Sequence, residues 1–143
     1  VLSGAMAAID RAIEIAGTKG VRRSVKLPVS APFHCALMAP AAAVMEAALA
    51  DTDLVRPLVP VMANVTAAPA ENPEDLRRLL VEQVTSLVRW RESVLAMRDA
   101  GVDTLIELGA GKVLTGLAKR IDRDMTAMNV ETPADVEAVL ETL

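Results

Sequence analysis

A single histidine, His34, stands between an apolar extended stretch that Pro32 ends and a helix expected from about Ala36. Loops at the ends of strands commonly carry catalytic groups, and a helix N-terminus disfavours a charged ring, which would leave the imidazole able to accept a proton. His34 is therefore a candidate general base. A lone histidine on an apolar face is more commonly a hydrogen-bonded packing residue, so the residue pattern leaves both interpretations open.

Gln83 is a polar residue at a position where the helical pattern predicts an apolar one. Leu76, Leu80 and Leu87 share its helical face by spacing. An unpaired buried amide costs about 1 to 3 kcal/mol, so we expect a polar partner, for which an imidazole is one candidate. Capping of a neighbouring backbone group, or a place at the edge of the face, explains Gln83 equally well.

The pattern predicts neither a nucleophile nor a metal site. All serines lack the glycine-flanked elbow that exposes a catalytic hydroxyl. Cys35 adjoins His34, and chain neighbours point in different directions, so Cys35 is expected to be a small core residue. One histidine and one cysteine cannot supply the ligands of a usual metal site. If His34 is a base, its nucleophile lies outside this chain.

The run ELGAGK, residues 107–112, resembles a phosphate-binding loop, but it matches neither of the two common glycine-rich phosphate-binding patterns. A P-loop needs four residues between its first glycine and the Gly-Lys pair, and a Ser or Thr where Val113 stands. A dinucleotide fingerprint needs glycine in place of Leu114. Close packing of a strand against a helix is the preferred explanation for Gly109, Gly111 and Gly116.

Composition excludes several classes of partner. The 143 residues are 52% hydrophobic with a net charge of -4, and the only aromatics are Phe33 and Trp90, so nucleic acid is not expected as a partner. Prolines interrupt the uncharged run 27–45, which argues against a membrane span. One cysteine and no recognisable leader favour the cytoplasm, and the pattern Asn64-Val65-Thr66 is attributed to chance rather than glycosylation.

Hydrophobic periodicity predicts an α/β fold with a mainly parallel sheet. The high apolar content is typical of strands buried on both faces or of a piece of a larger core. Because the chain opens at Val1, a truncated domain is expected. Helices are predicted over 5–16, from about 36, over 73–88, from about 91, over 113–121 and over 133–140, and strands over 25–29, 58–65, 104–108 and 126–130, with a loop at 67–73.

The chain resembles the malonyl-CoA:acyl carrier protein transacylases of bacterial fatty acid synthesis. Four runs carry the resemblance in the family's order and spacing: LPVSAPFHCALMAP, VPVMANVT, VEQVTSLVRW and ELGAGKVLTGLAKRI. It covers nearly the whole chain but only the C-terminal half of a family member. The family's nucleophile, the serine of a GHSxG elbow, and the arginine that pairs the malonyl carboxylate both precede this half.

By that resemblance His34 matches the catalytic histidine, which takes the serine proton and returns it to the departing thiol. Gln83 matches the glutamine whose carbonyl orients the ring. Phe33 precedes the histidine as in many malonyl-selective acyltransferases and is the expected substrate-binding residue. The resemblance implies no cofactor and no metal.

The resemblance also implies the fold, the partners and the activity. Residues 1–30 would end a ferredoxin-like small subdomain, and 31–143 would form the C-terminal part of an α/β-hydrolase-like large subdomain. Malonyl-CoA, the acyl carrier protein and the missing N-terminal half would be the partners, and the chain alone would be inactive. The alternatives are the acyltransferase portion of a modular polyketide or fatty acid synthase, and a non-catalytic interaction fragment.

Overall fold

The computed structural model describes residues 1–142 as two compact units. Unit 1 comprises residues 1–65 and 69–88, and unit 2 comprises residues 66–68 and the described residues from 89 onward. The mixed α/β class predicted from the sequence is confirmed. The elements are α1 (Met6–Thr18), η1 (Ala36–Met38), α2 (Ala39–Ala50), β1 (Val61–Ala63), β2 (Ala68–Ala70), α3 (Pro73–Thr85), α4 (Trp90–Asp99), β3 (Thr104–Leu108), α5 (Val113–Ile121), β4 (Thr126–Val130) and α6 (Pro133–Leu140).

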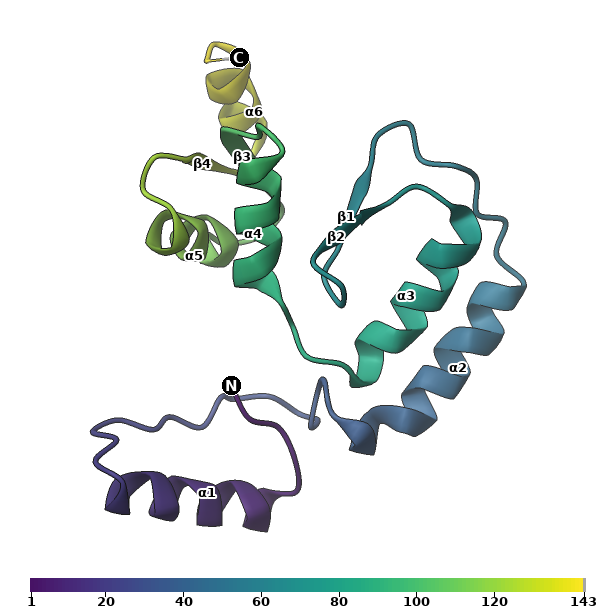
Figure 1. Ribbon diagram of the computed structural model, residues 1–143. Helices are drawn as coiled ribbons and strands as arrows, with labels where there is room; N and C mark the ends of the chain where they lie inside the picture. Colours follow the sequence, from purple (N-terminus) through teal and green to yellow (C-terminus); the bar gives the residue numbers. More distant parts are fainter. Residues whose placement is uncertain (143) are drawn as a thin grey trace. The chain divides into compact units, whose positions relative to one another are not determined.

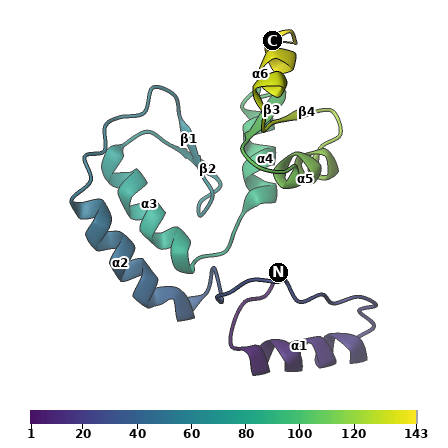
Figure 2. The ribbon, with the colours of Figure 1, turned by 180° about the vertical axis from the view of Figure 1, so that it is seen from behind.

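Helices α2 and α3 lie side by side in unit 1 (Figures 1 and 2). Helix α3 begins where the sequence predicts. The side chain of Asn72 accepts hydrogen bonds from the backbone N–H groups of Glu74 and Asp75, at 2.8 and 3.4 Å, and Pro73 occupies the first turn. The helix ends at Thr85, earlier than predicted, because Ser86 adopts an extended conformation. This early end determines which carbonyl groups near the C-terminus of α3 are available to other partners.

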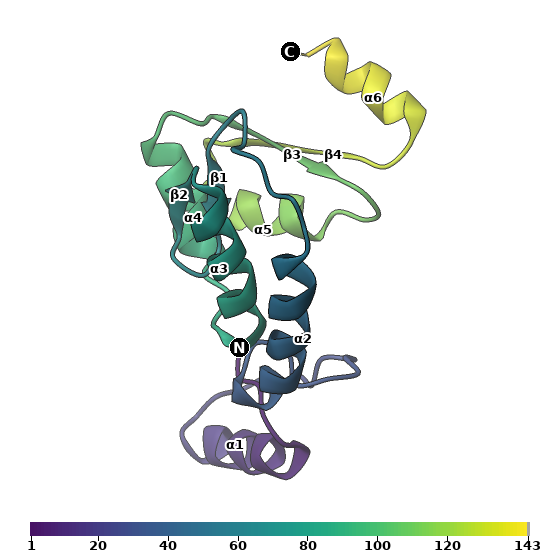
Figure 3. The same cartoon turned by 90° about the vertical axis from the view of Figure 1, so that its right-hand side faces the viewer.

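Unit 2 is built on two parallel strands, β3 and β4, which pair from Thr104 opposite Thr126 to Leu108 opposite Val130. Helix α5 lies along one face of this pair (Figure 3). Helix α6 begins with a capping box, in which the side chains of Thr132 and Asp135 each accept from the other's backbone N–H. All four of these elements have the predicted bounds.

Glu107 caps helix α5 with its carboxylate. One oxygen accepts from the N–H of Leu114 at 3.0 Å and the other from that of Thr115 at 2.8 Å. Hydrogen bonds from Thr115 and from Leu114 hold the pKa of Glu107 below its ordinary value. A carboxylate of the protein thus occupies the helix N-terminus where a phosphate loop would hold its anion.

The packing explanation for the three glycines of this region is wrong. Within residues 1–142, apart from adjacent residues and the backbone of the same helix, no atom lies within 4 Å of the place where a Cβ would stand on any of them. Gly109 and Gly111 instead have φ angles of +124° and +89°, which glycine adopts without a steric penalty. The turn therefore needs glycine for its backbone conformation.

The predicted strands of unit 1 are shorter than expected or absent. Only Val61–Ala63 of the expected strand 58–65 is a strand, β2 stands within the expected loop 67–73, and residues 25–29 form no strand. The described strands make two separate two-stranded sheets, β1 with β2 and β3 with β4, in place of one mainly parallel sheet. An alternating pattern of apolar side chains does not by itself make residues 25–29 a strand, because a strand also needs a neighbouring strand to pair with.

Few apolar residues are buried. The core within residues 1–142 contains seven apolar residues: Ala63, Leu79, Val94, Ala118, Met125, Ala127 and Val139. By contrast, Leu108 at the end of β3 is 78% exposed, so the expectation of strands buried on both faces is wrong for this strand. The exposed apolar side chains fit the second expectation, a piece of a larger core. No helix in residues 1–142 has the length and apolar character needed to cross a bilayer.

Candidate active site

His34 lies in a turn between Pro32 and the short helix η1. Its φ angle is +61°, in the left-handed region that most non-glycine residues avoid. Such a conformation persists only where the surroundings enforce it, and it is found disproportionately at functional sites. The backbone at His34 therefore marks the turn as a candidate site independently of the imidazole.

The imidazole of His34 contacts the C-terminal end of helix α3. Its Nδ1 atom lies 2.9 Å from the main-chain carbonyl oxygen of Gln83. This carbonyl belongs to the last turn of α3, which ends at Thr85, and the last four carbonyls of a helix have no partner within it. The contact joins two turns that are 49 residues apart in the sequence.

This contact decides which ring nitrogen can act as a base. A carbonyl oxygen only accepts hydrogen bonds, so Nδ1 must carry the proton and donate it. In the neutral ring Nε2 then holds the free lone pair. The interaction persists when the ring takes up a second proton, because both nitrogens are then donors.

His34 lies just before a helix, as expected, but its ring makes a hydrogen bond to the end of a different helix. The sequence suggested the positive partial charge of a helix N-terminus, which would oppose a charged ring. The hydrogen bond of the ring is instead to a carbonyl at the C-terminal end of α3, whose partial charge is negative. Such a carbonyl keeps its hydrogen bond from Nδ1 while Nε2 takes up and releases a proton. This arrangement suits a group that takes up a proton and then returns it.

The side-chain amide of Gln83 is held by two other groups. Its Oε1 accepts from Nδ2 of Asn64 at 2.7 Å, and its Nε2 donates to the main-chain oxygen of Ser86 at 3.3 Å. Nε2 also lies 3.4 Å from Nδ1 of His34. Gln83 is half-buried, and it has the polar partners that its place on an apolar helical face demands. The expected apolar face was misplaced in part, because Leu79 is buried while Leu80 and Leu87 are exposed.

Asn64 is the site residue that the sequence interpretation missed. It is the first residue of the turn between β1 and β2, and its pattern was attributed to chance. A polar residue directly after an apolar strand was the only available signal, and this signal is common at turns.

The neighbours of His34 are placed differently from one another. Phe33 is 44% exposed, so its ring is available at the surface of unit 1. Cys35 is half-buried and donates from its Sγ to the carbonyl oxygen of Pro32 at 3.2 Å, so it is not the core residue that was expected. Within residues 1–142, no group of His, Cys, Asp and Glu side chains could hold a metal ion.

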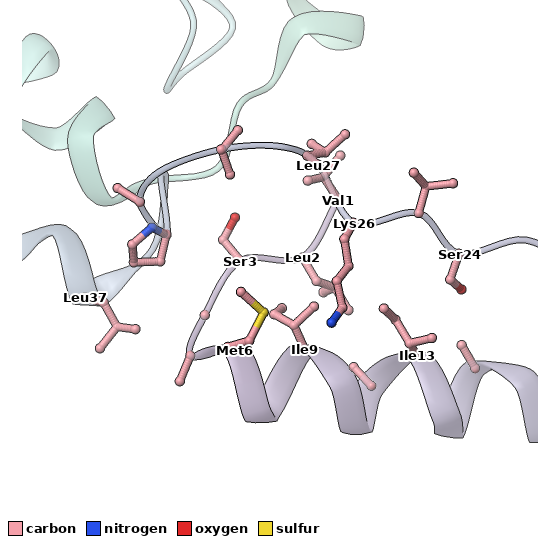
Figure 4. Close-up of a pocket in the computed structure, with 18 of the residues that line it drawn as sticks. Val1, Leu2, Ser3, Met6, Ile9, Ile13, Ser24, Lys26, Leu27 and Leu37 are labelled. Atoms are coloured by element: carbon pink, nitrogen blue, oxygen red, sulfur yellow. The ribbon is translucent and has the colours of Figure 1, made fainter.

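A hollow of about 680 Å³ lies in the amino-terminal part of unit 1. Figure 4 shows Met6, Ile9 and Ile13 of α1 directed toward the chain that includes Leu2 and Leu27. Neither His34 nor Gln83 lines it, so the hollow is separate from the candidate site. Several of the apolar residues that line it, such as Leu2, Met6 and Leu27, are exposed.

No family model matches the chain. The malonyl CoA-acyl carrier protein transacylase of Bacillus subtilis is 38% identical over 143 residues, which are all of this chain and 45% of the relative. An acyl-carrier-protein-S-malonyltransferase structure from Bartonella henselae is 50% identical, with a TM-score of 0.89, over 95% of this chain and 43% of that one.

A third match is a malonyl-transacylase solved in complex with a type II PKS acyl-carrier protein. It is 38% identical, with a TM-score of 0.92, over 98% of this chain and 45% of that one. The chain therefore spans slightly less than half the length of the relatives it matches. Over almost its whole length, the chain is therefore similar in sequence and in structure to malonyl CoA-acyl carrier protein transacylases.

Proposed function

We propose that this chain supplies the general base of a malonyl transferase, which moves malonyl from coenzyme A to the thiol of an acyl carrier protein through a serine ester. His34 is the base and Gln83 orients it. The observation that carries the proposal is the 2.9 Å contact between Nδ1 of His34 and the carbonyl oxygen of Gln83, because it leaves Nε2 as the proton acceptor.

The imidazole of His34 is neutral again at the end of each half of the reaction. In the first half, Nε2 takes the proton of the serine hydroxyl as its oxygen bonds to the malonyl carbonyl carbon. The carbon–sulfur bond then breaks, and Nε2 returns the proton to the departing thiolate. The second half runs in reverse, with the carrier thiol as nucleophile and the serine as leaving group.

By this proposal, the serine and the carboxylate-binding arginine are supplied by a part of the protein outside these 143 residues. The exposed apolar residues support this division, since the missing half would cover them. By the same proposal, residues 1–30 complete a ferredoxin-like subdomain and 31–143 form part of an α/β-hydrolase-like one. A cytoplasmic location belongs to the proposal too.

Phe33 is proposed to contact the malonyl group. It precedes the base in the same turn, and its ring is 44% exposed and thus free to meet a substrate. The carrier is the less defined partner. The related transacylase was solved with a polyketide carrier, which makes a polyketide acyl carrier protein the second candidate beside that of fatty acid synthesis.

Transfer by the complete protein tests the proposal. Purified protein, malonyl-CoA and either carrier are mixed, and the malonylated carrier is measured by intact mass. We expect transfer by the complete protein, none by residues 1–143 alone, and a loss of about 10² to 10⁴ in rate for His34→Ala.

His34→Gln provides a control of similar size that cannot take up a proton, and it should be as slow as His34→Ala. An unchanged rate in either variant would remove His34 from the mechanism. Comparison of the two carriers identifies the natural one, and transfer to neither would overturn the assignment.

A further inference from the structure

We propose that Asn64 is a positioning residue that holds the amide of Gln83 and thereby keeps the ring of His34 in the tautomer needed by a base. This inference rests on the proposed function, and it assigns a role to a residue that acts on the ring through Gln83. It is carried by the contact between Asn64 and Gln83 and by the orientation that this contact enforces.

The orientation of the Gln83 amide follows from a fixed acceptor. The main-chain oxygen of Ser86 can only accept, so Nε2 of Gln83, which is a donor, must face it at 3.3 Å. Oε1 of Gln83 is then directed toward Asn64. Asn64 must present its own donor, Nδ2, which lies 2.7 Å away.

In the orientation that makes this hydrogen bond, Asn64 leaves its own side-chain oxygen unpaired among the described residues. Within residues 1–142 its Oδ1 is buried and has no hydrogen-bond partner. A residue selected only for packing would avoid a buried acceptor that is left unpaired. The orphaned oxygen therefore favours a role for the Nδ2 donor beyond stabilising the turn.

The role concerns the ring because the Gln83 amide can compete for it. Nε2 of Gln83 already lies 3.4 Å from Nδ1 of His34. An amide released from Asn64 could donate to Nδ1, which would require the proton to move to Nε2. The base would then lose its lone pair at the reacting position. Asn64 prevents this by holding Oε1, and it leaves the main-chain carbonyl as the acceptor for Nδ1–H.

Asn64→Leu is the decisive variant, since leucine has nearly the same shape and no donor. In the complete protein we expect kcat for malonyl transfer to fall about tenfold with KM for malonyl-CoA unchanged, the size of effect seen when an orienting partner is removed. The ¹⁵N NMR spectrum of the His34 ring, assigned by its loss in His34→Ala, should change from one tautomer, with Nδ1 protonated, to a mixture.

Two further variants separate positioning from folding. Asn72→Ala removes the cap at the opposite end of the same helix and should lower stability without changing the tautomer. Asn64→Leu combined with Gln83→Ala should be no slower than Gln83→Ala alone, because both changes act through one amide. A slower double variant would contradict the proposal.

An Asn64→Leu variant that keeps either the wild-type kcat or the single tautomer overturns the inference. The ring spectrum does not depend on turnover. If the wild-type protein transfers no malonyl group, the proposed function fails, while the spectrum still decides whether Asn64 controls the ring.

Discussion

The Nδ1 atom of His34 lies 2.9 Å from the main-chain carbonyl oxygen of Gln83. The acceptor that orients the ring is thus a backbone group, which any residue at position 83 would carry. What the side chain of Gln83 adds is a hydrogen-bonded anchor to Asn64 and to Ser86. The two contributions can be separated by mutation.

Gln83→Ala should lower kcat/KM for malonyl transfer by about tenfold, whereas His34→Ala should lower it by about 10² to 10⁴. The alanine keeps the carbonyl that accepts from Nδ1 but loses the anchored amide. Steady-state kinetics of the complete protein measure both values. Equal losses in the two variants would show that the carbonyl alone does not hold the ring.

His34→Gly should be more stable than His34→Ala by about 1 kcal/mol, because φ is +61° at this position and glycine adopts it without a steric penalty. Both variants lack the imidazole, so the comparison isolates the backbone. Urea unfolding of the complete protein gives the two free energies. As a control, Ala43→Gly within helix α2 should have the opposite sign, with a loss of about 1 kcal/mol.

Glu107→Gln should destabilise the protein at neutral pH and have little effect in acid. Hydrogen bonds from Thr115 and Leu114 lower the pKa of Glu107 in the folded state, so its ionised form contributes stability. That contribution is complete above the ordinary pKa of a glutamate, about 4.3, and is lost as the pH falls through the lower folded value. Urea midpoints at pH 7 and pH 3 measure this, and an equal loss at both would contradict the capping role.

Asn72→Ala should cost about 1 kcal/mol of unfolding free energy, since it removes the side-chain oxygen that accepts from Glu74 and Asp75. Asn72→Asp retains an acceptor and should match the wild type. Thermal and urea unfolding of the two variants provide the check. A loss in both would mean that the amide nitrogen of Asn72, rather than its oxygen, matters.

The second half of the fold could be predicted almost to the residue. Thr132 and Pro133 mark the start of α6, and the glycines at 109 and 111 mark the turn before α5. These signals are local, because each acts within a few residues of the element that it begins or ends. Unit 1 lacks such signals for its strands, and residues 25–29 would need a pairing neighbour that the sequence pattern cannot supply.

The candidate site likewise has residues that the sequence predicts and contacts that it does not. His34 and Gln83 were singled out as unusual residue types in apolar surroundings, and the structure brings them together. The main-chain acceptor was not predictable, because a backbone carbonyl is present at every position and only the early end of α3 makes this one available. Asn64 was missed for a related reason, since nothing in its turn sequence indicates a partner 19 residues away.

The stop at Thr85 makes helix length a functional variable. One additional turn would commit the Gln83 carbonyl to the N–H of Leu87, and the imidazole would lose its acceptor although every site side chain remained in place. Insertions or helix-favouring replacements around Ser86 should therefore lower malonyl transfer activity more than replacements on the solvent side of the same helix.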